Sequence, residues 1–252
     1  MTQTPSVAAS FGTVASAYAR YRPTYPPGLF DWIAAAAPGR QIAWDCACGS
    51  GQATHDLAAR FEHVIATDAS AEQIAAARPH AQVEYRVATA EHSGLTPASV
   101  DALTVGQALH WFDLPAFFAE VRRVLRPGGL LAAWTYNMPV VRESAVQQLL
   151  MHLYRDTVGA FWPAGRQHVE SGYRTISIPF APLGAPSFTM SQNWMRGDLV
   201  GYVSSWSAVA RYRAATGDDP IRPFEQQLAA IWPAAESQRI VDWPLSVRSA
   251  RI

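Results

Sequence analysis

The segment Gln41–Ala53 most constrains the fold, because a short apolar run leads directly into a loop of very small residues. Ile42–Trp44 predicts a buried strand, Asp45 ends it, and a helix is expected over Gln52–Phe61. Small residues let the backbone turn sharply and let a ligand lie against N–H groups at the start of a helix. The segment therefore predicts a cofactor-binding loop between a strand and a helix.

The spacing of the small residues distinguishes two classes of cofactor. A dinucleotide loop has the pattern G-x-G-x-x-G/A, and no register of this loop places a small residue at the third position. The pattern present is Asp-x-Ala-x-Gly-x-Gly, which resembles motif I of the class I S-adenosylmethionine-dependent methyltransferases. The resemblance implies that four residues hold the methionine part of the cofactor: Asp45, Ala47 (a glycine in most of the family), Gly49 and Gly51. A tight turn with no ligand is the alternative.

Composition excludes several other kinds of chemistry. The 252 residues carry no net charge, which argues against a nucleic-acid or anionic-membrane partner. All twenty basic residues are arginines, so lysine Schiff-base chemistry and a Walker A lysine are excluded. The two cysteines, Cys46 and Cys48, lie inside the small-residue loop, where packing is favoured over a zinc site, so we predict no metal. With no signal peptide and no membrane-spanning run, a cytoplasmic location and no membrane partner are expected.

The segment before the first predicted helix is rich in tyrosine, arginine and proline. The sequence Tyr18–Pro26 resembles the N-terminal segment of small-molecule methyltransferases, which folds over the cofactor cleft as a lid. The resemblance implies that Tyr18 and Arg22 approach the methionine end of the cofactor, where an arginine can pair with its carboxylate. A surface arm with solvated arginines is the alternative. The helix itself is expected over Leu29–Ala37.

A second buried strand is predicted at His63–Asp68, and its last residue is an acid. Asp68 follows the glycine loop at the spacing of an acid that accepts hydrogen bonds from ribose hydroxyls. We therefore assign Asp68, with the adjacent Ala69, to the cofactor site. The alternative role for Asp68 is to cap the helix expected at Ala71–Ala77.

The next two strands are expected at Val83–Val87 and Ser99–Val105. By resemblance, Ala90 and Glu91 after the first of them line the adenine pocket. The second is followed by the heptad Q-A-L-H-W-F-D, which resembles the branch of small-molecule methyltransferases that includes trans-aconitate methyltransferase.

In that branch the residues of the heptad divide into two groups. The resemblance places Gln107 and Ala108 against the cofactor, and His110 and Trp111 at the junction of cofactor and substrate. His110 and Trp111 are therefore the catalytic candidates. Histidine is the side chain whose pKa suits a base near neutral pH, although His110 has the alternative of bonding a neighbouring loop.

The helix Leu114–Leu125 and the strand Gly129–Tyr136 complete five β/α alternations, which imply an α/β fold with a doubly wound parallel sheet. By resemblance the sheet is Rossmann-like, mostly parallel and seven-stranded, with the order 3-2-1-4-5-7-6 and helices on both faces. We predict one structural domain overall with three parts: a lid and first helix (1–38), a cofactor-binding core (39–136) and a C-terminal part (137–252).

The C-terminal part is expected to hold a helical, aromatic-rich insertion that caps the substrate, with ordinary packing of a small subdomain as the alternative. Its expected elements are a helix at Val140–Val158, an irregular stretch at Phe161–Pro186, a strand at Ser187–Met195, helices at Leu199–Arg213 and Pro223–Trp232, and a strand at Arg239–Val247 in which Pro244 marks an edge or bulge.

Together these observations predict an enzyme that transfers a methyl group from S-adenosylmethionine to an oxygen, or a nitrogen or carbon, of a small molecule, with a carboxylate among the acceptors considered. A monomer or weak homodimer is expected. The alternatives are an NAD-dependent oxidoreductase and a non-catalytic nucleotide-binding module.

Overall fold

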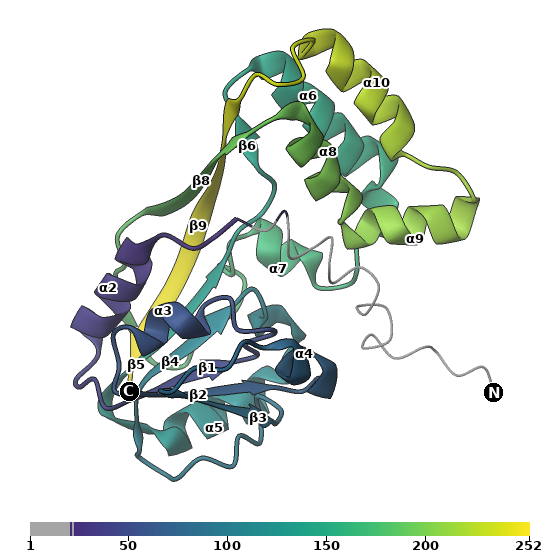
Figure 1. Ribbon diagram of the computed structural model, residues 1–252. Coiled ribbons are helices and arrows are strands. Elements are labelled where there is room, and N and C mark those ends of the chain that lie inside the picture. The colour runs from purple at the N-terminus through teal and green to yellow at the C-terminus, as the bar shows by residue number, and fades with distance from the viewer. Residues whose placement is uncertain (1–20, 22) are drawn as a thin grey trace, which may run out of the picture. The chain divides into compact units, whose positions relative to one another are not determined.

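The computed structural model describes residue 21 and residues 23–252, so the predicted lid residues Tyr18 and Arg22 lie outside the described residues (Figure 1). The chain forms two compact units. The sheet unit comprises Thr24–Asn137, Gln167–Thr189 and Pro244–Ile252, and the helical unit comprises Met138–Arg166 and Met190–Trp243 with the described residues before Thr24. The predicted parts follow the linear sequence, whereas these units are assembled from interleaved segments.

Five parallel strands form the main part of the sheet, in the order β3-β2-β1-β4-β5 (Figure 1). They are β1 (Ile42–Cys46), β2 (His63–Asp68), β3 (Val83–Val87), β4 (Val100–Gly106) and β5 (Leu125–Thr135). In β1, Asp45 aligns with Ala66 of β2 and with Thr104 of β4. Because the strands are parallel and aligned, their carboxyl ends meet at one edge of the sheet, which is where open α/β sheets bind ligands.

The long last strand, β9 (Arg239–Arg251), makes the sheet mixed, because it pairs antiparallel with β5. It also pairs with β6 (Val140–Val141), β7 (Ala181–Leu183) and β8 (Phe188–Trp194). The described residues thus form nine strands rather than the predicted seven, because two very short strands, β6 and β7, find partners along β9. Pro244 lies between the segments of β9 that pair with β6 and with β5, where its missing N–H removes no bond of those two ladders.

Helices pack on both faces of the sheet, as the alternating side chains of β5 show. Leu131 and Ala133 belong to a buried cluster with Phe117 and Val121 of α5 (Leu114–Val124). Trp134 points to the other face, where it makes an edge contact with Phe30 of α2 (Pro27–Ala36) at a centroid distance of 6.2 Å. Successive strand residues face opposite sides, so α5 covers one face of β5 and α2 covers the other. The shorter helices α3 (Thr54–Ala58) and α4 (Ala71–Ala76) follow β1 and β2.

The helical unit differs from two sequence predictions. The sequence predicts one helix over Val140–Val158, but this segment begins as β6 and becomes helical only in α6 (Ser144–His152). The helix continues into a π-helical turn at Leu153–Thr157. Leu199–Arg213 was also expected as one helix, but it divides into α8 (Arg196–Ser204) and α9 (Ser207–Thr216).

Aromatic packing explains the division between α8 and α9. Trp206 adopts an extended backbone, and its buried ring packs on Tyr154 and Trp162. The remaining α-helices of the described residues are α7 (Arg166–Glu170) and α10 (Ile221–Ile231). The sequence predicts an irregular stretch where α7 lies. Within the described residues, no helix has the length and apolar character needed to cross a membrane.

Candidate functional site

The small-residue loop after β1 holds the left-handed backbone that its sequence requires. Ala47, Gly49 and Gly51 have φ values of 54°, 58° and 91°. The loop is fastened to β2 by a bond from Cys48 N to Thr67 O of 2.9 Å, and it closes on itself through Gly51 N and Cys48 O at 3.0 Å. A Cβ at Gly51 would lie 2.7 Å from Tyr85 Oη, so a side chain there would displace the tyrosine hydroxyl as well as strain the backbone.

Ala47 carries a Cβ in a conformation that suits glycine, and this makes a testable expectation. We expect Ala47→Gly to raise the free energy of unfolding by about 0.5 to 1 kcal/mol, because relief of left-handed strain exceeds the added freedom of the unfolded chain. Urea unfolding measures the change. Ala53→Gly is the matched control, because Ala53 has an ordinary φ of −90° and should lose stability instead. If both variants lost the same free energy of unfolding, the left-handed backbone at Ala47 would not be a source of strain.

Asp68 meets the glycine loop directly. Its Oδ2 accepts a hydrogen bond from Gly49 N at 2.8 Å, and its Oδ1 accepts one from Ser70 N at 2.9 Å. Ser70, rather than Asp68, supplies the side-chain cap of α4 through Gln73 N. Asp68 and the glycine loop, which are separated in sequence, are therefore in direct contact in the fold. Ala69, the next residue, is exposed.

Asp45 occupies a different kind of position from Asp68. Its side chain is buried, and its two oxygens accept bonds from the hydroxyls of Thr54 at 2.6 Å and Thr104 at 3.0 Å. Burial raises the pKa of Asp45 to about 6, although both threonine bonds favour the ionised form. Asp45 thus joins β1, β4 and α3 beneath the loop, and its predicted contact with the methionine part stays a prediction.

The turn after β3 carries the residues predicted for the adenine pocket. Ala88 N bonds Asp68 O at 3.0 Å, and Thr89 and His92 form an isolated antiparallel bridge, so the turn is closed at the end of β2. Ala90 is buried in this turn. Glu91 Oε1 accepts a bond from Asp113 N at the start of α5, at 3.0 Å. Both predicted adenine residues therefore stand at the same edge as Asp68.

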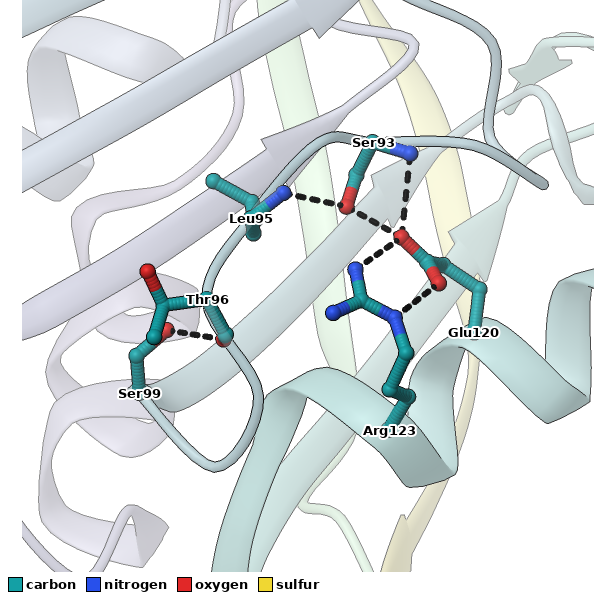
Figure 2. Close-up of polar contacts among 6 residues, drawn as sticks. All are labelled: Ser93, Leu95, Thr96, Ser99, Glu120 and Arg123. Carbon is teal, nitrogen blue, oxygen red and sulfur yellow. Dashed lines mark hydrogen bonds and ion pairs between the residues drawn. The ribbon is translucent and has the colours of Figure 1, made fainter.

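A buried carboxylate supports the far side of this turn (Figure 2). Glu120 of α5 accepts bonds from Ser93 N at 3.0 Å and from the Ser93 hydroxyl. Arg123 adds a two-pronged ion pair, in which Nε donates to Glu120 Oε2 and Nη2 donates to Glu120 Oε1, each at 2.7 Å. These bonds hold the pKa of Glu120 well below its usual value, at about 2, chiefly through Arg123.

The end of β4 brings the cofactor candidates Gln107 and Ala108 to the same edge. Gln107 has a φ of 61°, and its side-chain amide bonds both Thr135 Oγ1 and Tyr136 O at the end of β5. Gly106 packs against Trp134, whose indole atoms would lie 3.1 to 3.3 Å from a Cβ at that position. The strained backbone of Gln107 is therefore fixed by β5, which sets the direction in which the chain leaves β4.

The two catalytic candidates follow in a short 3₁₀ turn, Leu109–Trp111. The His110 ring lies 4.6 Å from that of Trp111, which is 50% exposed. His110 Nδ1 lies 3.1 Å from the hydroxyl of Tyr173. Sequence reasoning missed Tyr173, which lies 63 residues away in a stretch with no periodic pattern. The one signal in the sequence that could have indicated Tyr173 is its place directly after the pair Ser171-Gly172, where a bulky side chain follows two small ones.

Comparison with known proteins places these residues in a family. A family model described as a methyltransferase domain matches residues 44–133. A candidate methyltransferase of Dictyostelium discoideum is 33% identical over 236 residues, covering 92% of this chain and 90% of that protein. The solved structure of a candidate type II methyltransferase from Anaeromyxobacter dehalogenans is 45% identical with a TM-score of 0.87, covering 91% and 97% of the two chains. A Saccharomyces cerevisiae protein assigned to the S-adenosylmethionine-dependent methyltransferases is 32% identical over 131 residues, 48% of this chain and 45% of that protein.

The fold and the loop define an α/β enzyme that binds a nucleotide-containing cofactor at the carboxyl edge of its sheet. The chain belongs to the class I S-adenosylmethionine-dependent methyltransferases, and S-adenosylmethionine is its cofactor. The structure fits this cofactor, because three left-handed positions open the loop backbone and the Asp68 carboxylate stands against it. The contacts that individual residues make with the cofactor stay predictions.

Proposed function

We propose that this methyltransferase acts on an oxygen nucleophile of a small molecule, with nitrogen and carbon nucleophiles as the other acceptors, in the branch that trans-aconitate methyltransferase represents. One observation carries the proposal. Gly49 and Asp68, which are hydrogen-bonded to each other, and the turn with His110 all lie at the carboxyl ends of the adjacent parallel strands β2, β1 and β4. The heptad that follows β4 supports the choice of branch.

The predicted cofactor contacts among the described residues would divide among the parts of the cofactor as follows. S-adenosylmethionine, when bound, supplies a methyl group made electrophilic by a positively charged sulfur. Asp68 would accept the ribose hydroxyls, while the backbone of the small-residue loop lies along the methionine part. Ala90 and Glu91 would flank adenine. The ring of Trp111 would form part of the wall near the reacting centre, where an aromatic face favours a nearby cation.

The acceptor decides whether the protein must move a proton. A carboxylate is already ionised at neutral pH, so the chain only has to align it and exclude water. A phenol would need a base, and His110 is the residue placed to take that proton. We therefore expect carboxylic acids to need no base from His110, and phenols to depend on one.

The test has a binding step and a transfer step. We expect S-adenosylhomocysteine to bind with micromolar affinity in isothermal titration, and NADH to give no heat. Panels of small carboxylic acids and phenols are then incubated with methyl-labelled S-adenosylmethionine, using wild type and His110→Gln. Transfer to a small acceptor supports the proposal. Failure of the folded protein to bind S-adenosylhomocysteine, or heat with NADH instead, would overturn it and favour the oxidoreductase.

A further inference from the structure

Tyr173 is held in a conformation that a bulky residue rarely adopts. Its φ is 61°, and Gly172 before it has a φ of 60°, so two consecutive residues are left-handed. Gly172 cannot be replaced, because a Cβ there would collide with the side chain of Ser246. Left-handed backbone is unfavourable for an L-residue with a Cβ, and such strain persists where the surroundings enforce it, often at functional sites.

Four hydrogen bonds enforce this turn. Tyr173 N donates to His168 O at the end of α7 at 2.7 Å, and Gly172 N donates to Val169 O at 2.9 Å. Tyr173 O accepts from Ile176 N at 3.1 Å and from Arg248 Nη1 of β9 at 2.8 Å. The turn is therefore fixed both to α7 and to the part of β9 that belongs to the sheet unit.

The strained turn delivers a fully buried phenol ring to His110. The two rings are 5.9 Å apart, and the Tyr173 hydroxyl lies 3.1 Å from His110 Nδ1. In a neutral imidazole one nitrogen donates and the other accepts, so a bond at one nitrogen sets the role of the other. A phenol is a stronger donor than an imidazole N–H, so the favoured arrangement is the Tyr173 O–H donating to Nδ1.

We propose that Tyr173 is a positioning residue of the transferase site, which holds His110 by Nδ1 and keeps its proton on Nε2. His110 would then present an N–H, and not a basic nitrogen, to the acceptor. Of the two acceptor classes proposed above, this arrangement favours the carboxylate, which is already anionic, over the phenol, which needs a base. The consequence for transfer rests on the proposed function. The coupling between Tyr173 and His110 does not, and it can be measured without any substrate.

Nitrogen-15 NMR of the histidine side chains measures the coupling directly. In the neutral wild-type protein we expect the Nε2–H tautomer of His110 to dominate. Tyr173→Phe should change the ratio of the two tautomers about fivefold, the effect of one ordinary hydrogen bond. Tyr154→Phe is the matched control, since Tyr154 is also buried and its hydroxyl accepts a bond from Arg166 Nε at 2.8 Å within the helical unit. That control should leave His110 unchanged.

A second variant guards against a Tyr173→Phe protein that does not fold. Arg248→Gln removes the bond to Tyr173 O from a distance, and it should shift the His110 ratio in the same direction by a smaller factor. A wild-type protein with Nδ1–H dominant, or a folded Tyr173→Phe with an unaltered ratio, would overturn the proposal. Titration of S-adenosylhomocysteine on the same samples separates the two ideas, because its failure removes the proposed function while the tautomer ratio still decides the role of Tyr173.

Discussion

Asp68→Ala is expected to weaken the binding of S-adenosylhomocysteine about 100-fold. The carboxylate already orders the loop through Gly49 N and stands where ribose hydroxyls are expected. Loss of two hydrogen bonds to a charged group, at about 1.5 kcal/mol each, corresponds to about that factor in Kd. Isothermal titration of wild type and variant measures the ratio, and thermal unfolding of both proteins shows whether the loop region remains folded.

Two further variants separate the ribose contact from the support of the loop. Asp68→Asn keeps an oxygen that can accept from Gly49 N but loses the charge, so we expect about a 10-fold weaker Kd. Asp31→Ala removes a carboxylate of α2 that pairs with Arg60 at 2.7 Å, and it should leave Kd within about twofold. If folded Asp68→Ala bound S-adenosylhomocysteine as wild type does, the ribose role of Asp68 would be wrong.

The parts of the site that sequence predicted well are those set by local geometry. Small residues at alternate positions after a buried strand permit a sharp turn, and Ala47, Gly49 and Gly51 make it with left-handed backbone. An acid at the end of the neighbouring parallel strand must then lie beside the loop, and Asp68 does. Chain direction and spacing within some twenty residues carry this information, so one sequence is enough to read it.

The parts that sequence could not supply depend on partners far along the chain. Both oxygens of Asp45 accept bonds from threonine hydroxyls, those of Thr54 and Thr104, and the second partner is 59 residues away. Tyr173 reaches His110 only because a strained turn is tied to β9 by Arg248. No periodicity marks either pairing. The break between α8 and α9 has the same origin, since burial of Trp206 outweighs the helical pattern around it.

Glu120→Gln should lower the free energy of unfolding by about 2 to 3 kcal/mol at pH 7. The Glu120 side chain is 8% exposed, and its bonds to Ser93 join α5 to the segment that directly follows Ala90 and Glu91 in the chain (Figure 2). Glutamine retains the shape and one acceptor but loses the ion pair with Arg123 and leaves a mismatched amide in a buried position. The partial exposure of Arg123, at 39%, keeps the loss below that of a fully buried pair.

The surface pair Glu84–Arg86 provides a matched control with nearly the same geometry. Its two bonds measure 2.6 and 2.7 Å, but the side chains are 48% and 36% exposed. Glu84→Gln should therefore change the free energy of unfolding by less than about 0.5 kcal/mol. Urea unfolding of both variants compares a buried ion pair with an exposed one of similar bond lengths. Glu120 differs further by its two bonds from Ser93. Equal losses would show that burial does not control the strength of the Glu120 pair.

The difference in free energy of unfolding between wild type and Glu120→Gln should depend on pH, and this dependence tests whether the bonds of Glu120 to Ser93 and Arg123 require its charge. The pKa of Glu120 is about 2 in the folded protein and 4.5 in an unperturbed chain, so the unfolded state binds its proton first as pH falls. The contribution of Glu120 is complete above about pH 4.5 and disappears as pH falls from there toward 2. The stability gap between wild type and Glu120→Gln should thus be constant from pH 7 to 5 and narrow below pH 4.5. A gap that stayed constant down to pH 3 would mean that shape, and not charge, makes Glu120 important.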